Sequence, residues 1–180
     1  TTAGLASAMG LFAARMLPAE AAATRDPFIE TLIAQMTLEE KAGQLSLFFD
    51  HAREDAPNIN PVQAAKTLAE VQSEIAAGRV GGLFNGIGTT SGRALQRIAV
   101  EESRLKIPLV FAADVIHGLR TVFPVPLGEA AAFDADLAER TARAAALEAT
   151  SVGVQWTFAP MVDVARDQRW GRVVEGAGED

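Results

Sequence analysis

Carboxylates and arginines gather in the second half of the sequence, and their chemistry suits recognition of a hydroxyl-rich ligand. Asp114 directly follows an apolar run at 109–113. The last part of the chain adds a dense group of polar and aromatic residues: Arg166, Asp167, Arg169, Trp170, Arg172 and Glu175. A carboxylate accepts hydrogen bonds, a guanidinium donates them in a fixed geometry, and an indole ring offers an apolar face. These residue types together indicate a sugar-binding site.

Polar side chains also follow two other apolar runs. Asn85 comes after the run at 80–84, and Asp163 comes after the run at 154–159. Ligands of α/β folds bind beyond the carboxyl ends of the strands, so we expect Asn85, Asp114 and Asp163 at that edge. An aspartate in this position can instead cap the amides of the loop that follows it, and spacing alone leaves both roles of Asp114 open.

Composition removes several kinds of chemistry. The chain of 180 residues has no cysteine, which excludes disulfides, thiol nucleophiles and cysteine-based metal sites. Its two histidines, His51 and His117, are too few for a histidine-rich metal site, and no serine–histidine–aspartate set accompanies them. A net charge of −7 argues against a nucleic acid as partner.

Three apolar runs, at 80–84, 107–113 and 154–159, predict buried strands. Helical patterns lie between them, and this alternation predicts parallel strands joined by crossover helices. Both an open doubly wound sheet and a closed (β/α)₈ barrel fit the pattern, and local periodicity does not separate the two.

Apolar positions at helical spacing predict helices at 28–36, 38–45, 61–78, 91–104 and 135–152. The last four have start signals, which are the Thr37–Glu40 capping box, Asn60–Pro61, Ser91 and Asp134. The charged segment 48–58 is expected to be a loop.

The two ends of the sequence differ from the rest. Residues 1–25 are rich in alanine and other apolar residues and contain Ala21-Ala22-Ala23, which predicts the remnant of a secretory signal. An amphipathic helix leading into the domain is the alternative. No other segment approaches the length of about 20 apolar residues that a membrane span needs. The sequence stops at Asp180 within its polar cluster, so we expect 26–180 to be part of a longer protein.

A set of motifs in a fixed order resembles the amino-terminal domain of glycoside hydrolase family 3, above all its bacterial periplasmic β-glucosidases. Each motif alone is weak, but their order is specific. Gln168 stands where the family pattern has proline, which bears on the stiffness of that loop and removes no charge. The motifs are Met-Thr-Leu-Glu-Glu-Lys-x-Gly-Gln-Leu at 36–45, Ile-Pro-Leu at 107–109, Asp-Val-Ile-His-Gly at 114–118, Thr-Val-Phe-Pro at 121–124, Ala-Pro-Met-Val-Asp-Val at 159–164 and Arg-Trp-Gly-Arg at 169–172.

The resemblance implies the amino-terminal portion of a (β/α)₈ TIM-like barrel, incomplete in this chain. It implies that Asp114 and Arg169 bind the sugar of the −1 subsite and that Arg120 can reach the pocket. In this reading Arg172 and Glu175 form an ion pair beneath the site. The remaining supporting residues are His117, which has a structural role, Asp163 and Asp167, which tie their loop together, and Trp170.

The activity implied by the resemblance is that of a retaining β-glucosidase, without metal or organic cofactor, periplasmic or secreted. Its nucleophilic aspartate and its acid/base glutamate would lie downstream of Asp180. The expected partners are a β-glucoside or oligosaccharide and the rest of the same polypeptide, its later barrel strands and carboxyl-terminal domains. A β-xylosidase of the same family is the main alternative, and the N-acetylglucosaminidase branch fits Arg-Trp-Gly-Arg less well. A non-catalytic sugar-binding or scaffold protein is the third.

Overall fold

The structure is a computed structural model that describes residues 26–50, 66–86 and 88–178. The chain divides into two units, one ending at Gln35 and the other beginning at Met36. The described part of the first unit is the helix α1 (Pro27–Gln35), which confirms the helix predicted there. The proposed signal remnant at 1–25 lies outside the described residues.

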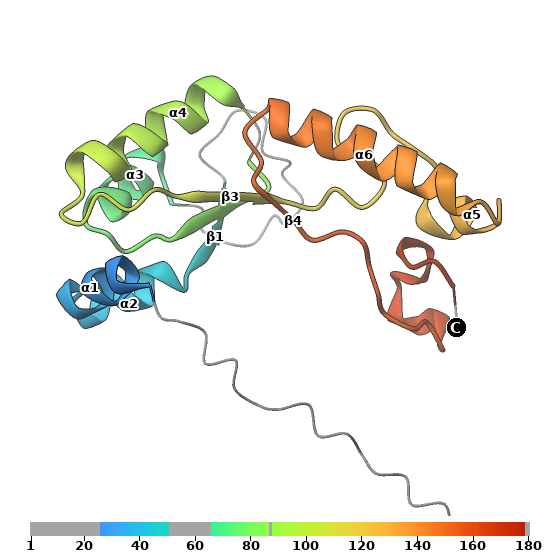
Figure 1. The fold of residues 1–180 in the computed structure, drawn as a ribbon, viewed down its shortest axis with the longest axis horizontal. Helices are drawn as coiled ribbons and strands as arrows, with labels where there is room; N and C mark the ends of the chain where they lie inside the picture. The colour runs from blue at the N-terminus through green and yellow to red at the C-terminus, as the bar shows by residue number, and fades with distance from the viewer. Residues whose placement is uncertain (1–25, 51–65, 87, 179–180) are drawn as a thin grey trace, which may run out of the picture. The chain divides into compact units, whose positions relative to one another are not determined.

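The second unit contains a parallel sheet of four strands in the order β1-β2-β3-β4 (Figure 1). The strands are β1 (Leu47–Phe49), β2 (Gly82–Phe84), β3 (Val110–Ala113) and β4 (Trp156–Thr157). Their register places Phe49 opposite Phe84, and Ala112 between Phe84 and Trp156. The predicted parallel topology is therefore confirmed, with shorter strands than the apolar runs suggested.

One strand contradicts the sequence-based prediction. Phe48 and Phe49 lie in β1, whereas the sequence predicts a loop from Phe48 onward. Its apolar run is limited to Leu47–Phe49, between Ser46 and Asp50, which is shorter than the runs that predicted the other strands, and a charged segment follows it. Pairing with β2 therefore decides its conformation.

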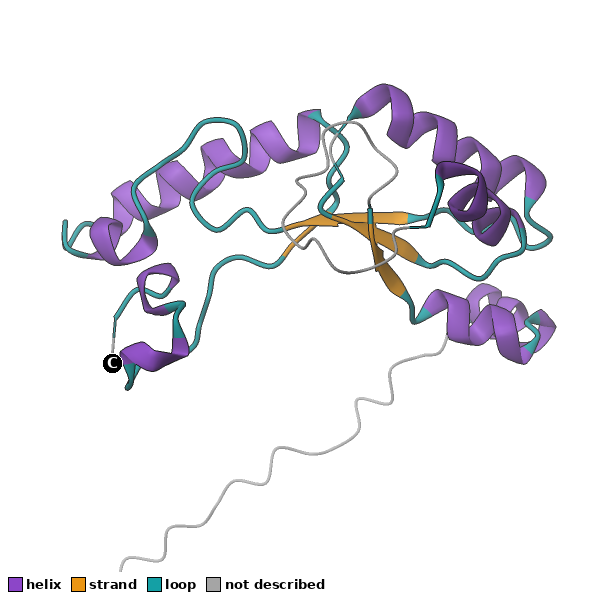
Figure 2. Cartoon of the chain, turned by 180° about the vertical axis from the view of Figure 1, so that it is seen from behind, coloured by secondary structure: helices purple, strands orange, loops and turns teal. Residues whose placement is uncertain are grey.

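Three helices lie on one side of this sheet, as Figures 1 and 2 both show: α3 (Leu68–Ala76), α4 (Thr89–Arg97) and α6 (Ala135–Ser151). α4 continues into a π-helical turn, Ile98–Glu102. The other helical elements are α2 (Leu38–Gln44), α5 (Pro126–Ala130) and two 3₁₀ turns, Gln168–Trp170 and Val173–Glu175. None of the described helices combines the length and the apolar character that crossing a bilayer demands.

Local capping sets the helix starts. Thr37 and Glu40 form the predicted capping box of α2, with the Thr37 amide donating to Glu40 Oε2 at 2.8 Å. Asp134 caps α6 by accepting from the Leu137 amide at 3.0 Å, also as predicted.

One predicted helix start is wrong, and another lies outside the described residues. α3 begins after Thr67, which forms a second capping box with Glu70, and the expected start at Asn60–Pro61 lies outside the described residues. α4 begins after Gly88 rather than after Ser91, and Ser91 lies in its first turn. The Ser91 hydroxyl donates to the Gly88 carbonyl instead of accepting a helix amide.

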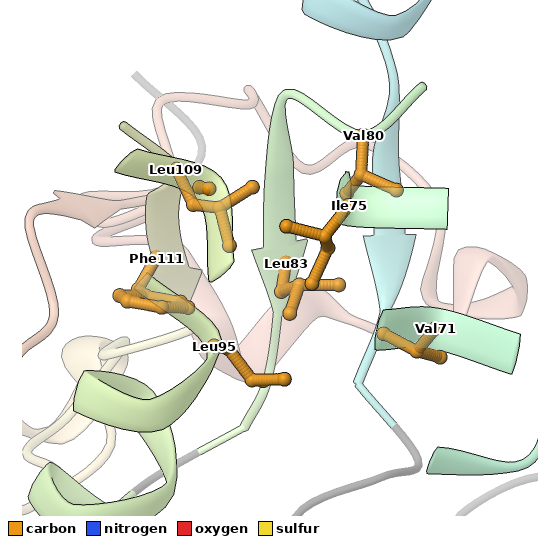
Figure 3. Close-up of a cluster of buried hydrophobic side chains, with 8 residues drawn as sticks. Val71, Ile75, Val80, Leu83, Leu95, Leu109 and Phe111 are labelled. Carbon is orange, nitrogen blue, oxygen red and sulfur yellow. The ribbon is translucent and has the colours of Figure 1, made fainter. Parts of the chain in front are cut away.

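The main core fills the space between α3, α4 and one face of the sheet (Figure 3). Leu83 and Phe111 are opposite each other in the β2–β3 register, and both side chains are buried. The other members of this cluster are Val71, Ile75, Val80, Leu95, Ala99 and Leu109. A second cluster packs α6 against the end of β3 and contains Ala113, Val115, Ala145, Ala149 and Val154.

The opposite face of the sheet carries aromatic side chains that α3, α4 and α6 do not cover. Ring contacts run from Phe49 to Phe84 at 5.7 Å, from Phe84 to Phe158 at 5.3 Å and from Phe158 to Trp156 at 4.9 Å. Trp156 remains 50% exposed. A doubly wound sheet has helices on both faces, so helices on one face and an apolar opposite face fit a segment of a barrel.

The amino ends of the strands are closely packed. A Cβ at Gly43 in α2 would lie 2.4 Å from the carbonyl oxygen of Gly78, so the two backbones are in direct contact there. Glu40 is 8% exposed, and its carboxylate accepts from Arg104 Nε at 3.0 Å. This hydrogen bond from Arg104 is the main cause that lowers the pKa of Glu40, followed by the Thr37 amide.

Candidate functional site

The site is built around Asp114, which is exposed directly after β3. Asn85 follows β2, and the two residues exchange hydrogen bonds. The Asp114 amide donates to Asn85 Oδ1 at 3.0 Å, and Asn85 Nδ2 donates to Asp114 Oδ2 at 3.3 Å. The prediction that Asn85 and Asp114 lie at the same edge is therefore confirmed.

The loop after Asp114 is held in one shape by its own backbone. The Phe123 amide donates to the His117 carbonyl at 2.8 Å, and His117 Nδ1 lies 3.0 Å from the Phe123 carbonyl oxygen. Gly118 has φ of 101°, and a Cβ there would lie 1.9 Å from the Thr121 carbonyl oxygen, so only glycine fits. His117 thus closes this loop, which accords with the structural role expected for it.

Glu148 of α6, which the sequence analysis does not single out, anchors the same loop. Its carboxylate accepts from the Arg120 amide at 2.9 Å, from the Thr121 amide at 3.0 Å and from the Thr121 hydroxyl at 3.1 Å. The hydrogen bonds from these backbone amides lower the pKa of Glu148, and the bond from the Thr121 amide has the largest effect. The side chain of Arg120 starts from this anchored backbone and is exposed.

The carboxyl-terminal segment folds back on itself through a bridge between Met161 and Gly176. Arg172 and Glu175 form the predicted ion pair, with Arg172 Nε 3.0 Å from both carboxylate oxygens. The hydrogen bond from Arg172 lowers the pKa of Glu175. The pair therefore closes the turn that carries it.

Arg172 also interacts electrostatically with the strand ends. Its bond to Glu175 is the largest cause that raises the pKa of Arg172, and smaller attractions to Asp114 and Asp163 act in the same direction. Both aspartates are exposed. Asp114 therefore lies in the field of a guanidinium on the folded-back segment.

Arg169 takes a different position. Its Nε donates to both oxygens of Asp167 at 2.9 Å, and its side chain is 91% exposed. Asp167 also accepts from the Arg169 amide at 2.9 Å, so it does tie this loop together as predicted. The hydrogen bond to Asp167 is the main cause that raises the pKa of Arg169. Trp170 beside it is partly exposed, in the same 3₁₀ turn.

Two residues near this edge escaped the sequence analysis. Asp50 follows β1 and is 1% exposed, and its amide donates to the Phe84 carbonyl at 2.8 Å. Its signal was an aspartate after an apolar run, the same signal as at Asp114. Glu148 had no local signal, because its partners lie 27 and 28 residues earlier in the chain.

The described residues that gather at the carboxyl ends are hydrogen-bond donors and acceptors with exposed charge, and they suit a polar neutral ligand. Nowhere in ranges 26–50, 66–86 and 88–178 do three histidine, aspartate or glutamate side chains gather in a way that could hold a metal ion. The arrangement can therefore bind and orient hydroxyl groups through carboxylate and guanidinium contacts.

Comparisons with known proteins agree with this geometry. The family model described as the glycosyl hydrolase family 3 N terminal domain matches residues 37–180. The chain is 43% identical to a periplasmic β-glucosidase of Salmonella typhimurium over 97% of its own length, and 29% identical to a putative β-xylosidase of Formosa agariphila over 89%. It spans about a fifth of the length of these relatives, 21% and 22% respectively.

Solved structures give the same result for the fold. A β-glucosidase from Listeria innocua, solved in complex with isofagomine, matches 85% of this chain and 20% of its own chain, with a TM-score of 0.68 at 36% identity. The four parallel strands and their helices are thus part of a (β/α)₈ barrel. The chain belongs to glycosyl hydrolase family 3, and residues 37–180 match the amino-terminal domain of that family.

Proposed function

We propose that this chain is the first part of a retaining β-glucosidase, which releases terminal β-D-glucosyl residues from the non-reducing ends of its substrates. The observation that carries the proposal is the exposed carboxylate of Asp114, held by Asn85 at the carboxyl ends of the sheet. The 43% identity to a protein named as a periplasmic β-glucosidase supports the substrate class.

In this proposal the chain supplies sugar recognition and the later part of the polypeptide supplies the reacting groups. A retaining glycosidase uses a nucleophilic carboxylate and an acid/base carboxyl about 5–5.5 Å apart. Both would come from later segments of the longer polypeptide, because the chain spans about a fifth of its relatives' length. Asp114 would accept hydrogen bonds from hydroxyls of the −1 sugar, and these bonds would strengthen as charge develops on the sugar ring.

Arg169 would donate to the same sugar. Its Nε and one terminal nitrogen are engaged by Asp167, and a guanidinium has five N–H donors, so others remain for a ligand. Asp167 would then act as the residue that fixes the guanidinium plane. Arg120 would approach the pocket from the loop that Glu148 anchors.

We also propose that the longer protein is exported, with residues 1–25 as the remnant of its signal and 26–180 as the start of its barrel domain. The apolar, alanine-rich composition of 1–25 and the name of the Salmonella typhimurium relative support this. No metal or organic cofactor enters the proposed reaction, since two carboxyl groups suffice for double displacement.

A β-xylosidase is the second candidate, because the names of two relatives from Formosa agariphila include β-xylosidase. A xyloside lacks the hydroxymethyl group of a glucoside. The two activities would therefore differ in the contacts that the site makes with this hydroxymethyl group.

The test uses the longer polypeptide that contains this sequence. We expect it to hydrolyse an aryl β-glucoside with a kcat/KM at least about tenfold above that for the matching β-xyloside, since a site that hydrogen-bonds a substrate hydroxyl discriminates against an analogue without it. Proton NMR of the first product should show the β-anomer, as double displacement requires. A preference for the xyloside would favour the β-xylosidase over the β-glucosidase. An α-anomer as first product would refute the retaining mechanism.

A further inference from the structure

The carboxylate of Asp114 is oriented by a single neighbour on another strand. Asn85 Nδ2 donates to Asp114 Oδ2 at 3.3 Å, while the Asp114 amide donates to Asn85 Oδ1 at 3.0 Å. One side chain therefore fixes both the backbone and the carboxylate of Asp114. Within the described ranges, no protein donor reaches Asp114 Oδ1, so this oxygen is left for a ligand.

Asn85 is itself held in an uncommon conformation. Its φ is 60°, in the left-handed region that side-chain-bearing residues seldom adopt and asparagine tolerates best. Its amide donates to the Ala112 carbonyl at 2.8 Å, which extends the β2–β3 ladder by one bond. The backbone turn at Asn85 thus aims its amide side chain at the residue that follows β3.

We propose that Asn85 is a positioning residue, which sets the orientation of the Asp114 carboxylate so that Oδ1 faces the −1 sugar. The proposal rests on the function proposed above, because it needs Asp114 to contact the sugar. Asn85 itself need not touch the substrate. Its effect on the reaction passes through Asp114, and this separates it from a sugar-binding residue and from a residue that only stabilises the fold.

The test is a double-mutant cycle in the longer polypeptide with an aryl β-glucoside as substrate. Asn85→Gly removes the side chain and also relieves the left-handed conformation, so it should not lower the Tm. We expect kcat/KM to fall roughly 10- to 100-fold, because small misplacements of a positioned group have effects of this size. The loss should appear mainly in kcat, since the Asp114 contact gains strength in the transition state.

The decisive arm is the Asn85→Gly change made in an Asp114→Ala background. If Asn85 acts through Asp114, the second change should lower kcat/KM by less than about twofold, because the two effects are then not additive. Lys106→Gly is the matched control, since Lys106 has φ of 58° and precedes β3 at the opposite edge. It should leave both kcat and KM unchanged.

The outcomes separate the two proposals. A longer polypeptide without β-glucosidase activity, or one in which Asp114→Ala has no effect, would refute the proposed function. Activity that depends on Asp114 but is unchanged by Asn85→Gly would refute the positioning role alone. Fully additive losses in the double mutant would also refute it, because Asn85 would then act independently of Asp114.

Discussion

The amino and carboxyl ends of the parallel strands are built on opposite principles. At the amino ends, backbone packs on backbone where Gly43 meets Gly78, and the charge on Glu40 is nearly buried and paired with Arg104. These contacts lie within the described chain and join α2 to the segments that precede β2 and β3, so this end serves stability.

At the carboxyl ends, an exposed carboxylate is held by a side chain from the neighbouring strand end. Asp114 is exposed beside Asn85 with its φ of 60°, and Gly118 has φ of 101°. Uncommon backbone conformations persist where the surrounding structure holds them, as Glu148 holds the loop here. The amino ends of these strands therefore stabilise the fold, and the carboxyl ends are available for function, as in barrel enzymes generally.

The largest expected effect concerns whether this chain can hydrolyse a glycoside without the rest of the polypeptide. We expect residues 1–180, expressed without later segments, to show no turnover of an aryl β-glucoside. The aromatic face of the sheet, with Trp156 half exposed, and the unpaired outer edges of β1 and β4 in the described sheet would favour aggregation. Turnover by this piece that Asp114→Ala abolishes would mean that the reacting carboxylates lie within the chain, against the proposal.

Within the longer polypeptide, Asp114→Ala should lower the activity and leave the stability of the fold unchanged. We expect kcat/KM to fall about 10²- to 10⁴-fold, because charge-assisted hydrogen bonds that strengthen in the transition state are removed. The Tm should change little, since Asp114 is exposed. A loss below about tenfold, with circular dichroism unchanged, would remove Asp114 from the sugar site.

A substitution at the amino ends of the strands should instead lower the stability of the fold. Gly43→Ala would place a methyl group 2.4 Å from the Gly78 carbonyl oxygen, a clash with backbone, and we expect unfolding to become easier by about 1–3 kcal/mol. Gly128→Ala in α5 is the control, because its Cβ would meet only ordinary contacts at 3.8 Å. Urea unfolding measures both. Equal stability of the two variants would contradict the close packing at this edge.

The sequence predicts most of what is local. The capping box at Thr37, the cap at Asp134 and the strand ends at Asn85 and Asp114 all follow from residues adjacent in the chain, and the structure confirms them. Their signals are short-range hydrogen bonds and apolar runs, which need no knowledge of the fold.

What the sequence does not predict depends on long-range pairing. The apolar run of β1 is shorter than the runs that predicted the other strands, and only its pairing with β2 makes it a strand. The attraction between Arg172 and Asp114 likewise depends on a segment that folds back through the bridge between Met161 and Gly176, which no local pattern in the sequence predicts.

The smallest expected effect tests how the carboxyl ends keep their shape. Hydrogen bonds from the Thr121 and Arg120 amides hold the pKa of Glu148 below its ordinary value of 4.5. A carboxyl whose pKa is lowered by folding stabilises the folded loop at pH values above that ordinary value, and this contribution disappears as the pH falls through the folded pKa. Glu148→Gln should therefore loosen the loop near pH 7, and the variant and the wild type should become alike on acidification.

Hydrogen exchange of the loop amides, corrected for intrinsic rates at each pH, measures this directly. At about pH 7 we expect the Arg120 and Thr121 amides to exchange roughly tenfold faster in Glu148→Gln than in the wild type, because hydrogen bonds to a charged acceptor are removed. The ratio should approach one as the pH falls through the folded pKa of Glu148. Glu139→Gln, on the same helix, is the control, since Glu139 is exposed and accepts from no amide of this loop within the described residues. A ratio that stayed constant with pH would mean that the size of the side chain, and not its charge, anchors the loop to α6.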